Sequence, residues 1–170
     1  RSFFERGILR WSDAARLDRL VRIQGIEILE ALEGRPVILL APHFVGVEFG
    51  GLRLAMDRRM VTMFSRQKDP AFDRFLYTYR TRFGGLAVSR QEGYRKAVRQ
   101  IKQGWPYYYM PDLDFGPKRS IFVPFFNVSA ATVTGLSYIA RLTKATVVPC
   151  VTRMLPGGGG YVIQLYPAWT

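Results

Sequence analysis

The sequence is poor in the side chains that most often build metal sites and reactive thiols. Its 170 residues include one cysteine, Cys150, and one histidine, His43. A single cysteine excludes an intramolecular disulfide and is typical of a protein in a reducing compartment. One histidine and one cysteine also argue against a zinc site. We therefore expect neither a metal nor another cofactor.

Several familiar catalytic and nucleotide-binding motifs are missing as well. The sequence has no G-x-x-x-x-G-K-[ST] phosphate loop and no G-x-G-x-x-G pattern, and the four glycines at 157–160 are not followed by Lys and Ser/Thr. Ser137, in GLSYI, lacks the second glycine of a nucleophile elbow. Cys150 lies in an apolar stretch, which does not suggest a Cys–His nucleophile. The sequence therefore signals no nucleophile of its own.

Long apolar runs are absent, and acidic residues are unevenly distributed. The longest uncharged stretch, 120–140, contains proline, asparagine and several hydroxyl residues, so it predicts strand, loop and helix rather than a membrane span. The net charge is +12: residues 1–52 are neutral overall, residues 53–119 carry +9, and residues 120–170 carry three basic groups and no acid. Such a field attracts phosphates, anionic lipid, nucleic acid or an acidic protein, with a merely solvated basic face as the alternative.

The stretch 37–51, VILLAPHFVGVEFGG, holds the strongest candidate for a catalytic group. Residues 37–40 predict a buried strand, His43 follows the proline that breaks it, and Glu48 comes five positions later in an expected helix. Five helical positions turn by about 500°, so the pair meets only if His43 lies in the preceding turn and folds back. Glu48 could then hold one ring nitrogen and leave the other free as a general base. The alternative is a structural histidine that caps the helix.

Such a base without a protein nucleophile suggests that the substrate supplies the nucleophile, for example a hydroxyl that attacks an activated acyl group.

Helix and strand signals alternate along the rest of the chain, which predicts an α/β layer fold in one domain. A helical stripe after Ser12, the expected N-cap, predicts one helix up to residue 32. Residues 1–11, RSFFERGILRW, suit either a helix at a membrane surface or an ordinary amphipathic helix.

The remaining expected elements are spaced as short strands and longer helices. Strands are expected at 60–64, 86–89, 105–110, 121–126, 146–151 and 161–166, and helices at 70–83, 94–103 and 133–144.

Five sequence blocks occur in an order that carries a family resemblance. They are HFVGVE from residue 43, SRQKDPAFD from 65, RTRFG from 80, PDLDFGPKRSIFVPFF from 111 and ATVTGLSYIARLTKATVVPC from 131. With these blocks the chain resembles the lipid A biosynthesis (lauroyl/myristoyl) acyltransferase family, within the larger glycerolipid-type superfamily that has a His–four residues–acid motif. The resemblance runs from about residue 34 to 170. Glu48 favours the lipid A branch, because the wider superfamily usually has Asp at that place.

The resemblance implies a fold and a function. The implied fold is glycerol-phosphate acyltransferase-like, with a mixed, largely parallel central sheet flanked by helices. The implied reaction transfers a fatty acyl chain from acyl carrier protein to a hydroxyl of a lipid A precursor, at the cytoplasmic face of the bacterial inner membrane. The expected partners are the carrier, the precursor and the anionic membrane surface, with no nucleic acid. We expect 1–170 to be one acyltransferase catalytic domain that lacks an N-terminal membrane helix and part of the C-terminus.

The resemblance and the residue types together suggest roles for the basic residues. His43 would deprotonate the acceptor hydroxyl, and Glu48 would orient the ring. Arg66, at the end of a strand, would bind a phosphate of the acceptor. Arg80 and Arg82 form an R-x-R pair that resembles the family's basic site, and the sequence leaves open which of the two points inward.

The polar loop after the strand at 105–110 supplies the other candidates. Asp112 resembles the acid of the family's third motif and would position an arginine or substrate hydroxyls, with Asp114 beside it. Lys118 and Arg119 would hold a second phosphate or the phosphopantetheine of the carrier. Four phenylalanines would line a groove for the acyl chain, with core packing the better interpretation for at least two of them: Phe115, Phe122, Phe125 and Phe126.

Two other functions stay open at the level of sequence. The first is an acyltransferase of the same superfamily that acts on another glycolipid or on an amine. The second is a basic nucleic-acid-binding domain, suggested by the +9 segment and the tyrosines at 107–109, although no recognition helix or RNA-binding motif stands out.

Overall fold

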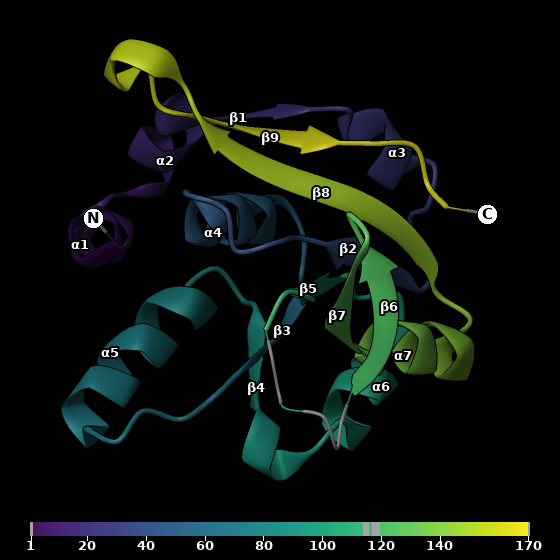
Figure 1. Cartoon of the computed structure of the whole chain (residues 1–170). Helices are drawn as coiled ribbons and strands as arrows, with labels where there is room; N and C mark the ends of the chain where they lie inside the picture. Colours follow the sequence, from purple (N-terminus) through teal and green to yellow (C-terminus); the bar gives the residue numbers. More distant parts are fainter. Residues whose placement is uncertain (1, 114–115, 117–119, 170) are drawn as a thin grey trace.

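The computed structural model describes residues 2–113, 116 and 120–169, and its centre is a seven-stranded sheet (Figure 1). The strand order is β1-β9-β8-β2-β5-β3-β4. The strands are β1 (Val21–Gln24), β2 (Val37–Leu40), β3 (Val61–Phe64), β4 (Leu86–Ser89), β5 (Tyr107–Tyr109), β8 (Thr146–Met154) and β9 (Tyr161–Leu165). Neighbouring strands run parallel, except for the antiparallel pair β8–β9. The predicted mixed, largely parallel sheet is confirmed.

Helices cover both faces of this sheet (Figure 1). They are α1 (Ser2–Trp11), α2 (Ala14–Leu20), α3 (Ile26–Glu30), α4 (Val47–Asp57), α5 (Pro70–Thr81), α6 (Arg95–Lys102) and α7 (Gly135–Thr143), with a short 3₁₀ turn at Arg90–Glu92. Successive strand residues point to opposite faces, so Leu39 packs in the core under α1, α2, α4 and α5, while Ile38 packs in the core under α6 and α7. Strands buried on both faces explain the continuous apolar runs in the sequence.

The N-terminal region differs from the single helix predicted to residue 32. The structure divides it into α2, β1 and α3. Within β1, burial alternates with a period of two, and Val21 and Ile23 align with Tyr161 and Ile163 of β9. The tertiary pairing with β9 therefore overrides the approximate helical stripe. The N-cap is Asp13 rather than Ser12, because its carboxylate accepts a 2.7 Å hydrogen bond from the Arg16 N–H.

Most other elements agree with the sequence pattern, because local signals define their ends. Asp69 caps α5 by accepting a 2.6 Å hydrogen bond from the Phe72 N–H, and Pro70 fills the first helical position. The predicted apolar strand at 121–126 is half of an antiparallel hairpin, β6 (Ser120–Phe125) with β7 (Val128–Val133), which is separate from the main sheet. Among the described residues, no helix combines the length and the apolar character needed to cross a bilayer.

Candidate active site

The register of two neighbouring strands brings His43 and Asp112 together. β2 and β5 run parallel, with Leu40 aligned to Tyr109, and the Ala41 N–H extends the pairing with a 2.8 Å hydrogen bond to the Tyr109 carbonyl. His43 and Asp112 each lie three residues beyond that aligned pair. Parallel strands end at the same edge of a sheet, which is where ligands bind in open α/β folds.

Asp112 holds His43 through both of its carboxylate oxygens. One oxygen accepts a 2.7 Å hydrogen bond from the His43 backbone N–H, and the other lies 2.7 Å from ring atom Nδ1. Burial acts to raise the pKa of Asp112, but the hydrogen bonds from the ring and backbone of His43 bring it below its ordinary value. An ionised carboxylate can only accept, so Nδ1 carries the hydrogen and Nε2 keeps a free lone pair. The side chains are 39% and 38% exposed, so substrate can reach them.

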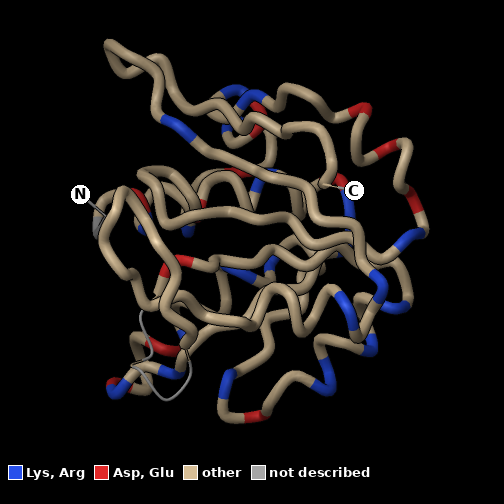
Figure 2. The backbone as a smooth tube through the Cα atoms, turned by 45° about the vertical axis from the view of Figure 1, so that its right-hand side comes forward, with Lys and Arg blue, Asp and Glu red and all other residues tan. Residues whose placement is uncertain are grey.

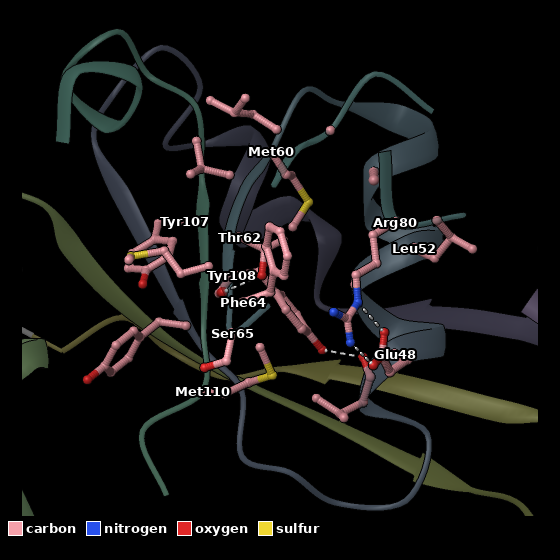
Figure 3. Close-up of a pocket in the computed structure, with 18 of the residues that line it drawn as sticks. Glu48, Leu52, Met60, Thr62, Phe64, Ser65, Arg80, Tyr107, Tyr108 and Met110 are labelled. Atoms are coloured by element: carbon pink, nitrogen blue, oxygen red, sulfur yellow. Dashed lines mark hydrogen bonds and ion pairs between the residues drawn. The ribbon is translucent and has the colours of Figure 1, made fainter. Parts of the chain in front are cut away.

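Glu48 belongs to a different cluster, formed between α4 and α5. Its carboxylate accepts a 2.8 Å hydrogen bond from the Tyr79 hydroxyl and a two-point contact from Arg80, with Nε at 3.1 Å and Nη2 on the other oxygen (Figure 3). Burial acts to raise the pKa of Glu48, but these hydrogen bonds and the charge of Arg80 lower it overall. Burial and the neighbouring Glu48 charge raise the pKa of Tyr79, so that phenol stays protonated and donates.

The predicted hydrogen bond between Glu48 and His43 is therefore wrong in this structure. The turn between β2 and α4 explains the difference. Gly46 precedes α4 with a φ of 90°, and a Cβ added there would lie 2.6 Å from the Tyr161 ring, so this tight turn needs glycine. His43 remains at the sheet edge beside Asp112, while Glu48, inside the first turn of α4, lies against Arg80 of α5. Whether Glu48 is needed for turnover stays a prediction.

The structure distinguishes the three arginines predicted to bind substrate. Arg80 lines a pocket beside His43. Arg82 instead donates to backbone carbonyls of Arg10, at 3.0 Å, and Ser12, so it ties α5 to the α1–α2 connection and does not line this pocket. Its predicted role in substrate binding stays a prediction. Arg66 donates a 3.1 Å hydrogen bond to Glu92. Its sequence neighbours Ser65 and Gln67 line the pocket, but Arg66 does not.

Four other predicted positions lie outside the described residues: Asp114, Phe115, Lys118 and Arg119. The remaining phenylalanines of the predicted groove, Phe122, Phe125 and Phe126, are exposed on the β6–β7 hairpin, so they belong neither to the core nor to the pocket wall. The structure instead forms the groove from other strands.

A pocket of about 270 Å³ opens beside His43 and continues between α4, α5 and the strands β5, β3 and β4 (Figure 3). His43, Glu48 and Arg80 are among the polar residues that line it. Most of the remaining wall is apolar or aromatic: Val47, Leu52, Ala55, Met60, Val61, Met63, Phe64, Leu86, Tyr107, Tyr108, Met110 and Leu113. The pocket can therefore hold an apolar chain with its polar end beside the histidine.

Sequence reasoning missed two features of this site. The pattern places Tyr79 on the apolar face of its helix and gives no sign that its hydroxyl reaches Glu48. The sequence pattern assigns Asp112 to the site but does not predict that Asp112 binds His43. That contact depends on β2 and β5 being neighbours in the sheet. No group of three or more His, Cys, Asp or Glu side chains suited to a metal occurs within the described ranges.

Comparison with solved structures identifies the class of fold. The chain is similar to the crystal structure of the 1-acyl-sn-glycerophosphate acyltransferase PlsC from Thermotoga maritima, with a TM-score of 0.55 and 16% sequence identity. The alignment covers 98% of this chain and 68% of that protein. The expected glycerol-phosphate acyltransferase-like fold is confirmed.

Sequence comparison then gives the family. The family described as bacterial lipid A biosynthesis acyltransferase matches residues 1–170, and the chain belongs to it. It is 35% identical over 147 residues to a lipid A biosynthesis acyltransferase of Haemophilus influenzae, which covers 85% of this chain and 46% of the relative. It is 36% identical over 129 residues to the lipid A biosynthesis myristoyltransferase of Escherichia coli, covering 74% and 40%. The chain thus spans about half the length of these relatives.

Proposed function

We propose that this protein transfers a fatty acyl chain from acyl carrier protein to a hydroxyl of a lipid A precursor, at the cytoplasmic face of a bacterial inner membrane. The observation that carries the proposal is a histidine that lies 2.7 Å from the Asp112 carboxylate and lines a largely apolar pocket. Membership of the lipid A acyltransferase family supports the choice of acceptor.

In the proposed reaction His43 acts as the general base. Nε2 takes the proton of the acceptor hydroxyl while that oxygen attacks the thioester carbonyl carbon of the donor. When the carbon–sulfur bond breaks, the imidazolium returns this proton to the departing thiolate, so the products are an ester and the free carrier thiol. Asp112 fixes the ring and stabilises the imidazolium between the two transfers. The apolar pocket wall would hold the acyl chain out of water.

Glu48, Tyr79 and Arg80 act by positioning rather than by proton transfer. The Glu48 carboxylate, which also accepts a hydrogen bond from the Tyr79 phenol, holds Nε and Nη2 of the Arg80 guanidinium in the pocket wall and leaves the N–H donors of Nη1 for a ligand. A guanidinium matches the two oxygens of a phosphate better than an ammonium does. Arg80 is therefore proposed to bind a phosphate of the acceptor.

The charge distribution supports an acidic carrier and an anionic membrane as partners. Lys and Arg positions outnumber Asp and Glu positions along the chain (Figure 2). Helix α6 buries Ala97 and Ile101 and exposes four cations to solvent: Arg95, Lys96, Arg99 and Lys102. Such a face attracts an acidic protein or anionic lipid over roughly 8 Å at physiological ionic strength. Nucleic acid is not among the proposed partners.

The proposal is tested by an acyl-transfer assay with the purified protein. Acyl carrier proteins loaded with chains of several lengths are incubated with a lipid A precursor, and the ester product is measured. Transfer that disappears in a folded His43→Ala variant would support the proposal. Absence of transfer at every chain length would overturn it, and transfer only to another glycolipid or to an amine would instead favour the alternative acceptor. DNA retention without any transfer would favour the binding-domain alternative.

A further inference from the structure

The β6–β7 hairpin carries a dense group of exposed apolar side chains that the pocket does not use. Ile121, Phe122, Phe125 and Val128 are each more than half exposed, and Phe126 is 87% exposed. The two strands pair with each other and not with the seven-stranded sheet (Figure 1). A two-stranded hairpin without a buried face is only marginally stable in water. Exposed apolar groups of this kind commonly mark an interaction surface.

The turn of the hairpin supports the same interpretation. Phe126 and Asn127 have φ values of 48° and 63°, as the central residues of a tight hairpin turn require. Asparagine tolerates this left-handed conformation, whereas a bulky side chain such as phenylalanine is strained there. The Phe126 ring contacts the Phe125 ring at a centroid distance of 4.7 Å. The tip therefore carries two exposed aromatic side chains, Phe125 and Phe126. A glycine or a small polar residue would be less strained at position 126 and better suited to solvent.

The charge of the surrounding sequence indicates the kind of partner. Residues 120–170 include three basic side chains and no Asp or Glu. No carboxylate of this segment would therefore repel an anionic surface. Phenyl rings and aliphatic side chains partition into the interfacial region of a bilayer, and nearby cations favour anionic headgroups.

The hairpin also lies next to the catalytic edge of the sheet. β6 begins eight residues after Asp112, and α7 begins two residues after β7 at Gly135. A Cβ added to Gly135 would lie 2.7 Å from the hydroxyl of Tyr109, the last residue of β5. The chain therefore returns from the hairpin beside Tyr109, the last residue of the strand that precedes Asp112, so the base of the hairpin lies beside the catalytic edge of the sheet.

We infer that the β6–β7 hairpin is a bilayer-inserting element, in which Phe125, Phe126 and their apolar neighbours enter the interfacial region of an anionic membrane. This inference deepens the proposed function, because it names the surface that would present a membrane-embedded acceptor to His43. Its test, binding to lipid vesicles, contains no substrate and is therefore independent of acyl transfer.

The first measurement is sedimentation with vesicles of phosphatidylethanolamine and phosphatidylglycerol. The double variant Phe125→Ser/Phe126→Asn removes both rings and places a turn-compatible side chain at the left-handed position, so the fold is retained. Binding should weaken by about tenfold or more, because burial of even one phenyl ring contributes an effect of that size. The matched control is Tyr166→Asn, which removes a half-exposed aromatic ring outside the hairpin and should bind like the parent chain.

The second measurement locates the hairpin in the bilayer. The native Cys150 is buried, so Asn127→Cys supplies an accessible thiol for an environment-sensitive fluorophore. Its emission should shift to the blue and be quenched by nitroxide lipids when vesicles are added. The same label at Glu33→Cys, in the exposed turn that precedes β2 at the opposite end of that strand, should not respond.

An absence of vesicle binding by the parent chain, unchanged binding in the hairpin variant, or an unresponsive label at position 127 would overturn the inference. So would a parent chain that self-associates through the hairpin, shown by loss of self-association in the variant, because the hairpin would then bind a second copy of the chain. Binding lost only after changes to Phe4 and Trp11, the exposed rings of α1, would also overturn it. Turnover of detergent-dispersed acceptor should persist in the hairpin variant. If the parent chain binds vesicles but transfers no acyl group, the proposed function fails and this inference stands.

Discussion

The two carboxylates at the site, Asp112 and Glu48, bind different kinds of partner, and this difference separates two functions within the site. Asp112 is more than a third exposed and binds the histidine ring, whereas Glu48 is less exposed and binds Arg80 and Tyr79. Both pKa values are lowered by hydrogen bonds to the ionised form, against the effect of burial. One carboxylate therefore binds the histidine and the other binds a cation, although the one closer in sequence to His43 is Glu48. Proximity in sequence is a poor guide to partnership at a sheet edge.

The largest effect is expected at the base itself. His43→Ala should lower kcat by about 10²–10⁴-fold, the usual contribution of general base catalysis, because it removes the proposed acceptor of the hydroxyl proton. The side chain is exposed, so thermal unfolding should stay close to that of the parent chain, which serves as the control. Near-normal turnover in folded His43→Ala protein would contradict the base assignment.

A smaller loss should follow Asp112→Asn. The native carboxylate accepts hydrogen bonds from both the backbone N–H and Nδ1–H of His43. An amide has only one accepting oxygen, so its NH₂ group would face one of these two donors and that hydrogen bond would be lost. We expect kcat to fall by about 10- to 100-fold, a part of the full contribution of the base, with little change in KM. Glu48→Gln should affect the acceptor KM more than kcat. The reverse order of kcat losses in steady-state assays would restore Glu48 as the partner of the histidine.

The contacts of Glu48 with Tyr79 and Arg80 should contribute to the free energy of unfolding. Glu48→Gln should lower the free energy of unfolding at pH 7 by about 1–2 kcal/mol, since it weakens charge-assisted hydrogen bonds to Arg80 that are only partly screened. The folded-state pKa of Glu48 lies below 4.5, so this stabilisation is present above that pH and is lost as the pH falls through the lowered value. Urea unfolding of both proteins from pH 7 to pH 3 should therefore show the difference shrinking at acid pH. A gap independent of pH would exclude the ion pair as its cause.

Arg82 should matter for packing and not for substrate. Arg82→Ala removes two hydrogen bonds to carbonyls of the α1–α2 connection and should lower the free energy of unfolding by about 1 kcal/mol. The acceptor KM should stay within about twofold, a free-energy change of roughly 0.4 kcal/mol. Arg80→Ala is the matched comparison and should raise that KM clearly. Equal KM changes in the two variants would return Arg82 to the site.

The smallest effect is expected at Arg66. Its pair with Glu92 has side chains 57% and 42% exposed. Exposed ion pairs contribute little, so Arg66→Ala should change the free energy of unfolding by less than about 0.5 kcal/mol. The acceptor KM decides its function. An unchanged value would remove Arg66 from phosphate binding, and a large increase would show that substrate draws the guanidinium away from Glu92.

Local signals predicted most of the architecture. The Asp69–Pro70 start of α5 and the apolar run of β2 are readable, because capping and burial act within a few residues. Residues 13–32 were mispredicted as one helix because β1 depends on β9, about 140 positions away, for its hydrogen bonds. The candidate site divides in the same way. His43 follows from residue type and motif, whereas the choice between Arg80 and Arg82 and the partners of Asp112 and Glu48 depend on packing between elements.

By itself, the sequence determined the single histidine, the excess of basic charge, the alternation of strands and helices and the motif blocks of the family, since these depend on composition and short-range pattern. The tertiary structure decided which acid meets the histidine. Strands β2 and β5 are almost 70 residues apart in the chain, and only their parallel pairing, with Leu40 beside Tyr109, brings Asp112 to Nδ1 of His43. Hydrogen bonding between strands acts over ångströms, without regard to separation along the chain.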